Sequence, residues 1–252
     1  MRKTLSGATG LVALLAIWQL AALKYNSMLL PGPYEVIKSW LYLFNAGLMT
    51  EHIKTSMARF AIGYIAAAVS GIVLGMFFGW FKKVWNFFNP VIQVMRPISP
   101  IAWIPFIVLW FGIGDIPAVV IIFLASFYPV LLSTTAAVGR VDKIYLKVAQ
   151  NFALTRLETL IKIVLPASFP QISTGLHQAI GTGWVFLVAG EMVGSQSGLG
   201  FLIIDSRNNL KPDWLLAAIL TIGIIGLLLD ELIKWIERQI YIKWGATEKH
   251  EG

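Results

Sequence analysis

The 252-residue sequence contains no cysteine and few charged residues. The absence of cysteine excludes a disulfide framework, a thiolate metal site and a cysteine nucleophile, and it leaves the redox compartment open. Charged residues make up 13% of the chain and hydrophobic residues 57%, whereas an ordinary soluble domain is about 25% charged. With a mean hydropathy of +0.73, the composition is that of a membrane protein.

Motifs for nucleotide, metal or acyl chemistry are also missing. No Gly-Lys dipeptide occurs, so there is no P-loop, and any ATP must be handled by another polypeptide. His52, His177 and His250 lie far apart without metal-ligand spacing, so we expect no bound metal or other cofactor. The stretch "GSQSGLG" nearly matches Gly-x-Ser-x-Gly but follows no predicted strand, and no nucleophile is paired with a base. We therefore expect no catalytic residue and no enzyme activity.

Charge-free stretches predict the membrane spans. About 20 apolar residues cross the hydrocarbon core, and the stretches that qualify are 4–23, 60–81, 97–114, 116–139, 163–190 and, at shorter length, 214–229. We therefore predict an all-α membrane protein with about six transmembrane helices.

The distribution of Lys and Arg predicts the orientation. They gather after the second, fourth and sixth spans, which places both termini in the cytoplasm and the chain in the cytoplasmic (inner) membrane as a multi-pass protein. The net charge of +7 then needs no nucleic-acid partner. The N-terminal run also begins as a signal peptide would, but its apolar part is longer than that of a cleaved signal, which favours an uncleaved first helix.

Two further patterns predict packing. Small residues recur every fourth position in the second span, at Gly63, Ala67, Gly71, Gly75 and Gly79, and such a stripe allows close approach of another helix. The segment 29–44 has prolines at its start and apolar residues at helical spacing, but it is too short to span. It is predicted to be an amphipathic helix on the outer surface.

The basic loop from Gly139 to Pro166 has the pattern of two short helices. Apolar residues recur at helical spacing in its first half, and Thr155 with Glu158 forms a capping box that predicts the start of a second helix. Pro166 is expected to help end that helix. Two interpretations of the apolar faces stand: the hairpin packs back on its own spans, or it docks a soluble partner.

Within this loop, "KVAQNFALTRLETLIKIVLP" resembles the inner-loop signature of binding-protein-dependent ABC importer permeases. That signature reads Glu-Ala-Ala, three residues, Gly, nine residues and Ile-x-Leu-Pro. The matching positions are Lys147, Val148, Ala149, Ala153, Ile163, Leu165 and Pro166. The sequence departs from the signature at Lys147, Val148 and Ala153. At the last of these, a Cβ would disfavour the positive φ that glycine adopts freely.

The resemblance extends over most of the chain. "LLPGPYEVIKSW", "MRPISPIAWIPFIVLWFGIGD", "VAGEMVGSQSGLGFLIID" and "AAILTIGIIGLLLDELIKWIER" are similar to permeases of the nitrate, sulfonate, taurine and bicarbonate importer group. The resemblance implies a type I importer transmembrane domain over residues 51–238, after an N-terminal region 1–50 and before a cytoplasmic tail 239–252. It also implies alternating access for a small, anionic solute, with a small heterocyclic vitamin precursor as the alternative.

The implied partners are two cytosolic ATPase subunits that carry ATP and Mg, a second permease copy, an extracytoplasmic solute-binding protein and membrane lipid. The residues expected to form the ATPase-coupling site are Lys147, Val148, Ala149, Phe152, Ala153, Thr155, Glu158, Ile163, Leu165 and Pro166. A secondary transporter or channel without an ATPase is the rival interpretation. Such carriers often show paired broken helices and several buried charges, and neither pattern is evident here.

Charged and aromatic residues within the spans are the candidates for a translocation pathway, because intramembrane charge is costly. The candidates are Arg96, Trp103, Trp110, His177, Trp184 and Glu191. The prolines after Arg96 are expected to break the helix, and irregular backbone is tolerated only beside protein or water. The alternatives are structural: Arg96 snorkels to headgroups, His177 bonds across helices, and the tryptophans fill the bundle.

Overall fold

Residues 2–25 and 29–243, which the computed structural model describes, form helices joined by short non-helical segments and contain no strand. In chain order the elements are α1 (Arg2–Lys24), α2 (Pro33–Asn45), α3 (Leu48–Trp80), α4 (Lys82–Met95), η1 (Pro100–Trp103, a 3₁₀ turn), α5 (Ile104–Phe111), α6 (Asp115–Gly139), α7 (Lys143–Asn151), α8 (Arg156–Thr159), η2 (Leu160–Val164, a π-helical turn), α9 (Leu165–Gly194), α10 (Leu199–Asn208) and α11 (Pro212–Lys243). The prediction of an all-α fold is confirmed.

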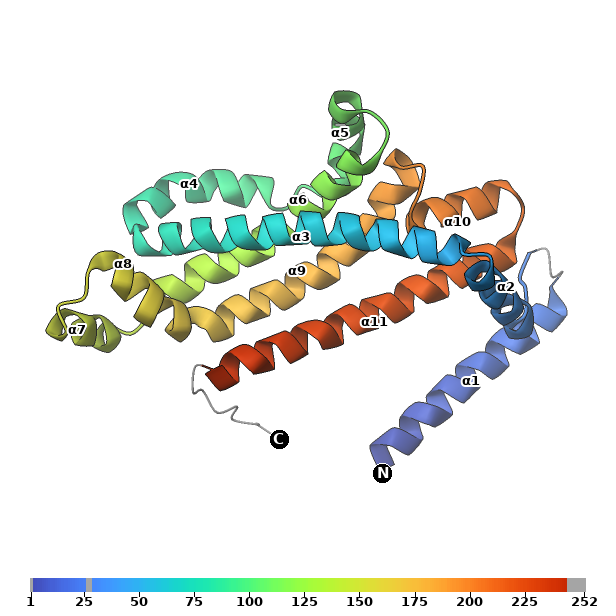
Figure 1. The fold of residues 1–252 in the computed structure, drawn as a ribbon, viewed down its shortest axis with the longest axis horizontal. Coiled ribbons are helices and arrows are strands. Elements are labelled where there is room, and N and C mark those ends of the chain that lie inside the picture. The colour runs from blue at the N-terminus through green and yellow to red at the C-terminus, as the bar shows by residue number, and fades with distance from the viewer. Residues whose placement is uncertain (1, 26–28, 244–252) are drawn as a thin grey trace.

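Three long helices, α3, α6 and α9, form the centre of the bundle, with α6 packed between the other two (Figure 1). The small-residue stripe of α3 faces α6, as predicted. A Cβ added at Gly75 would lie 2.6 Å from Thr134 Cβ, and one at Gly79 would lie 2.6 Å from Val138 Cβ. The two helices are therefore as close as glycine permits, and the attraction between them is van der Waals packing.

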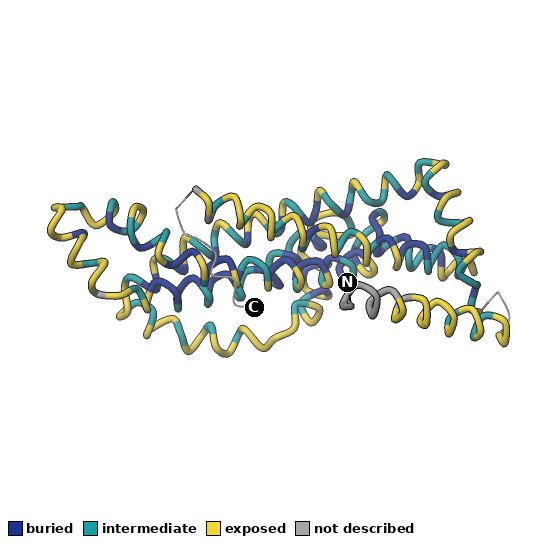
Figure 2. Tube along the Cα trace, turned by 90° about the horizontal axis from the view of Figure 1, so that it is seen from below, coloured by how far each residue is buried: buried dark blue, intermediate teal, exposed yellow. Residues whose placement is uncertain are grey.

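The predicted amphipathic helix is α2, which begins at Pro33. Its apolar residues Val36 and Leu43 are fully buried, and α2 packs against α11 and α3. In Figure 1, α2 and α10 lie at one end of the bundle and α7 and α8 at the opposite end. Figure 2 shows that the buried residues run along the centre of the bundle, while the outward faces are exposed as expected for contact with lipid.

About six spans were predicted, and the described residues account for three to five of them. Among the described residues, α3, α6 and α11 are long and apolar enough to cross a membrane, and two bent pairs raise the number to five. Residues 97–114 are not a span by themselves, because they hold only η1 and the 8-residue α5. The η1–α5 segment meets α4 at 83°, where Pro97 and Pro100 interrupt the helical hydrogen bonds.

The prediction that Pro166 helps to end the second hairpin helix is wrong. The helix that starts at Arg156 continues through η2 into α9 and ends at Gly194. The N–H of Leu165 donates to the carbonyl of Leu160, five residues earlier. This wider π turn comes directly before Pro166. Proline has no backbone N–H, and here that gap falls where the regular α-helical hydrogen-bond pattern is already interrupted.

Candidate functional site

The loop between α6 and α9 forms the predicted helical hairpin. Asp142 caps α7 by accepting a hydrogen bond from the N–H of Ile144 at 2.9 Å. The capping box of α8 is confirmed: Thr155 Oγ1 accepts from the N–H of Glu158, and the Glu158 carboxylate accepts from the N–H of Thr155 at 3.0 Å. Glu158 also pairs with Lys162 at 2.9 Å. Local hydrogen bonds therefore define both helices of the hairpin.

The turn between the two hairpin helices passes through the position where the family signature has glycine. Ala153 adopts a φ of 50°, in the left-handed region. Its N–H donates to the carbonyl of Gln150, and the N–H of Leu154 donates to that of Ala149 at 3.1 Å, which closes the end of α7. The turn thus keeps the conformation that glycine favours although the residue carries a Cβ.

One face of the hairpin is buried and the other is apolar but exposed. Ala149, Thr159 and Val164 are buried, whereas Lys147 is exposed and Ile163, Leu165 and Pro166 are half-buried. The exposed apolar side chains are Ile144, Tyr145, Val148, Phe152, Leu157 and Ile161, with Phe152 75% exposed. Folding back on the spans therefore covers only part of the apolar surface that the sequence predicted.

A polar cleft lies between the break after α4 and the facing sides of α6 and α9. Its volume is about 500 Å³, and its lining residues are Arg96, Ser99, Pro100, Leu124, Ala125, Tyr128, Pro129, Leu132, Ser133, Gln178, Thr182 and Phe186. We call it the central cleft. The guanidinium of Arg96 makes no ion pair or hydrogen bond within the described residues. An unpaired cation beside hydroxyl and amide groups gives the cleft the chemistry of an anion site.

Pro129 explains why polar groups gather in the central cleft. A proline in the middle of α6 cannot donate to the carbonyl of Ala125, four residues earlier. Thr182 Oγ1, on α9, lies 3.2 Å from that carbonyl oxygen and 3.0 Å from the Gln178 carbonyl oxygen of its own helix, so its one proton is shared between them. Ser133 Oγ likewise donates across to the Gln171 carbonyl. Hydroxyl groups of α6 and α9 therefore bond across the helix contact beside Pro129.

Glu191 lies in a buried polar cluster at the end of the bundle where α2 and α10 pack. Its carboxylate, with no exposed area, accepts from Arg59 Nη1 at 2.7 Å, Ser56 Oγ at 2.8 Å and the N–H of Gly200 at 3.0 Å. Arg59 also donates to Asp115 and to both Ser197 oxygens, so all five of its N–H groups have acceptors. The cluster ties α3 and α6 to the bend between α9 and α10.

The structure separates the six candidate pathway residues. Arg96 lines the central cleft, and Trp103 packs beside it in the apolar cluster around Ile104. Trp110 is 67% exposed on α5. His177 and Trp184 face α11 instead: His177 Nδ1 is 2.7 Å from Glu237 Oε1, and Trp184 Nε1 donates to the Ile222 carbonyl at 3.1 Å. With Glu191 in its own cluster, these residues do not form one site.

Sequence reasoning missed several residues that the structure places in polar sites. Arg59 directly precedes the charge-free stretch 60–81, which places it at the boundary of a span, but α3 begins at Leu48. Its spacing from Ser56, three residues earlier on one helix face, was the available signal. In the central cleft, Tyr128, Gln178 and Thr182 were also missed. Within residues 2–25 and 29–243, no three His, Asp or Glu side chains lie together to hold a metal ion; His250 lies outside them.

An all-helical fold with several membrane-length helices, a broken span and a polar cleft defines a polytopic membrane protein. Residues 71–241 match the family described as the binding-protein-dependent transport system inner membrane component. The chain belongs to this family, and it is therefore an inner-membrane transport component and not an enzyme.

Similar proteins cover nearly the whole chain. It is 34% identical to the taurine transport system permease protein TauC of Escherichia coli (94% of this chain, 88% of TauC). It is 33% identical to the nitrate import permease protein NrtB of Leptolyngbya laminosa (95% and 88%) and 32% identical to the bicarbonate transport system permease protein CmpB of Synechococcus elongatus (92% and 87%). An inward-facing structure of the MetNI methionine ABC transporter shares the fold, with a TM-score of 0.59 at 15% identity over 77% of this chain and 94% of that chain.

Proposed function

We propose that this chain is the permease subunit of an ABC importer that moves a small oxyanion, such as a sulfonate, nitrate or bicarbonate, across the cytoplasmic membrane. The relatives that match over nearly the whole chain are named for taurine, nitrate and bicarbonate transport. The observation that carries the solute class is the unpaired Arg96 guanidinium in the polar central cleft. A cation that lines a cleft lowers the cost of bringing an anion there, although Arg96 itself is exposed.

The hairpin is proposed to be the docking site for a cytosolic ATPase subunit. Its exposed apolar side chains, Phe152 above all, have the character of interface anchors. Two permeases and two ATPases make up the proposed complex, with a solute-binding protein at the opposite end, beside α2 and α10. Both termini then lie in the cytoplasm. This chain binds no ATP, which the partner hydrolyses.

Continuity of the helix provides the proposed coupling mechanism. Because α8, η2 and α9 form one uninterrupted helix from Arg156 to Gly194, a movement of the docked hairpin displaces α9 as well. α9 supplies Gln178 and Thr182 to the central cleft. Closure of the paired ATPases would therefore reshape the cleft, which is the physical basis of alternating access in this proposal.

Replacing Arg96 with Gln is expected to lower solute uptake about tenfold, because a lost charge-assisted contact is worth about 1.5 kcal/mol or more. The Arg96→Lys variant keeps the cation and should retain most of the uptake. Uptake of labelled taurine or nitrate is measured in cells or vesicles beside the amount of assembled complex. Normal uptake by the Gln variant at normal assembly would remove Arg96 from the pathway.

Replacing Phe152 with Ala is expected to weaken retention of the ATPase subunit about thirtyfold, because an interface anchor is worth about 2 kcal/mol. Phe152 is exposed, so its removal leaves the permease folded. The neighbouring Asn151→Ala variant is the control, since exposed polar residues at a rim contribute little. Co-purification from membranes measures retention, and equal retention in both variants would contradict docking at this face.

A further inference from the structure

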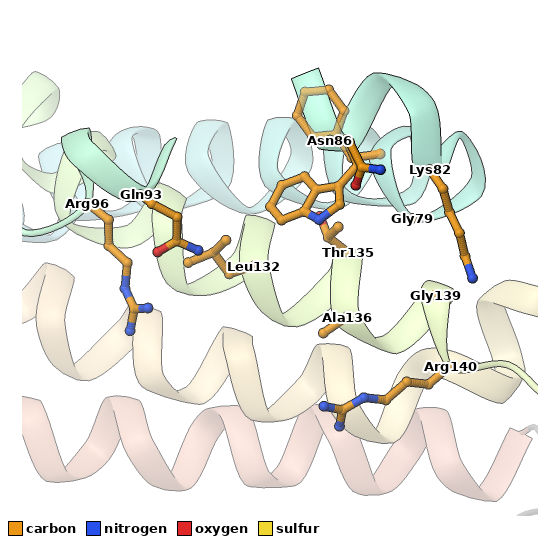
Figure 3. A pocket seen from close by; sticks show the side chains of 12 residues that line it. Gly79, Lys82, Asn86, Gln93, Arg96, Leu132, Thr135, Ala136, Gly139 and Arg140 are labelled. Atoms are coloured by element: carbon orange, nitrogen blue, oxygen red, sulfur yellow. The ribbon is translucent and has the colours of Figure 1, made fainter. Parts of the chain in front are cut away.

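A second cleft lies beside the hairpin, between α3, α4 and the end of α6 (Figure 3). Its volume is about 480 Å³, within the range of small-molecule sites. The lining residues are Phe78, Gly79, Lys82, Trp85, Asn86, Gln93, Arg96, Leu132, Thr135, Ala136, Gly139 and Arg140. We call it the basic cleft, because three of these residues are cationic and none is acidic.

The cations of the basic cleft are unpaired. Lys82, Arg96 and Arg140 make no side-chain hydrogen bond or ion pair within the described residues. In Figure 3, Arg96 and Arg140 lie at opposite ends of the cleft. The nearby carboxylate of Asp142 accepts a hydrogen bond from the N–H of Ile144, as the cap of α7. Three like charges around one cavity produce a strong attraction for an anion.

Helix ends surround the basic cleft: α4 begins there, whereas α3 ends at Trp80 and α6 at Gly139, so the cations must outweigh the negative dipole ends of those two helices. Lys82 is the first residue of α4, so the unpaired N–H groups and the positive dipole end of that helix lie beside it. Asn86 adds a side-chain amide, which donates to oxygen acceptors. A ligand with several oxygens around one negative centre matches these dispersed donors better than a single-atom anion does.

Apart from Gln93 and Thr135, the remaining wall of the basic cleft is apolar and partly aromatic. Phe78 lies in ring contact with Trp85 and Phe88, and Leu132 lines the cleft from α6. On α4, Phe87 is 76% exposed. A ligand with an anionic head and an apolar body would therefore find partners for both parts, as in basic pockets between transmembrane helices that bind anionic lipid headgroups.

We propose that the basic cleft binds a phosphate group, supplied by an anionic phospholipid headgroup or by free inorganic phosphate. The bound phosphate joins Lys82, at the turn between α3 and α4, to Arg140, which lies just before α7. It thereby fixes α4 relative to the hairpin. The phosphate site itself does not depend on the proposed function; only its placement in the inner leaflet rests on the hairpin being cytoplasmic.

Native mass spectrometry of the purified full-length protein tests this proposal, with phosphatidylglycerol, phosphatidylcholine and inorganic phosphate as probes. We expect one phosphatidylglycerol to bind more tightly than phosphatidylcholine, and the double variant Lys82→Gln/Arg140→Gln to weaken it about tenfold or more. Gly139→Leu should also weaken it by filling the cleft without a change of charge, because a Cβ at Gly139 meets no atom within 4 Å. The control is Lys83→Gln, which removes an adjacent exposed charge outside the lining.

The outcomes distinguish the source of the phosphate and the validity of the site. Retention of phosphatidylglycerol in millimolar inorganic phosphate identifies the lipid, whereas its displacement identifies the free ion. Equal binding by wild type and the double variant, or equal loss in the Lys83→Gln control, would overturn the proposal. The assay needs no ATPase and no transported solute, so its result is independent of the importer assignment.

Discussion

Replacing Glu191 with Gln is expected to destabilise the protein by about 3 kcal/mol, because the change leaves the buried guanidinium of Arg59 without its buried counter-charge. Arg59 is 3% exposed and Glu191 fully buried, and their contact of 2.7 Å closes the cluster that joins α3 to the bend after α9. The measurement is the midpoint of thermal or denaturant unfolding in detergent. We expect a clearly lower midpoint and less protein in the membrane.

Asp115 provides the matched control, since it pairs with the same Arg59 from the other side. Its side chain is 72% exposed, so Asp115→Asn should cost less than about 1 kcal/mol, as exposed ion pairs do. Equal destabilisation by the two substitutions would contradict the assignment of Glu191 as the buried counter-ion. A small effect of both would show that the cluster contributes little to the fold.

The second large effect is expected at the α3–α6 contact. A side chain at Gly75 would begin 2.6 Å from Thr134 Cβ and 3.0 Å from the Leu131 carbonyl oxygen. Neither is the flexible end of a side chain, so Gly75→Val must push the helices apart. We expect a loss of about 3 kcal/mol, at the upper end of overpacking effects, because the contact runs along the whole helix pair.

Gly223 is the control for this prediction. It lies within α11, and an added Cβ there meets no atom within 4 Å. Gly223→Val should therefore leave unfolding midpoint and membrane yield close to wild type. A loss of similar size at both positions would mean that valine disfavours these helices locally, and that close approach to α6 is not the reason for glycine at position 75.

Patterns that depend on a fixed spacing between nearby residues predicted their parts of the fold correctly. The capping box at Thr155 and Glu158 formed because it depends only on residues three apart. The stripe of small residues at every fourth position of α3 marks a helix contact, because larger side chains there would overlap α6.

Predictions failed where they depend on the angle between helices or on contacts between distant residues, because composition along the chain contains neither. A charge-free stretch gives the length of apolar chain, so it cannot show that α4 and the η1–α5 segment meet at 83°. It also places Arg59 at the boundary of a span, because a charge ends the stretch even where a buried partner such as Glu191 neutralises it. In the central cleft, Gln178 on α9 and Tyr128 on α6 come together only through the packing of those two helices.

The most direct test of the proposed function is solute uptake by reconstituted vesicles. They contain this permease with or without its ATPase partner, and the solute-binding protein is supplied at the face opposite the hairpin. Labelled taurine, nitrate or bicarbonate should accumulate only when the permease, the ATPase and ATP are all present, and the Phe152→Ala variant should abolish most of that uptake. Uptake at full rate by vesicles that hold the permease alone, without ATP, would contradict the proposal and identify a secondary transporter or channel.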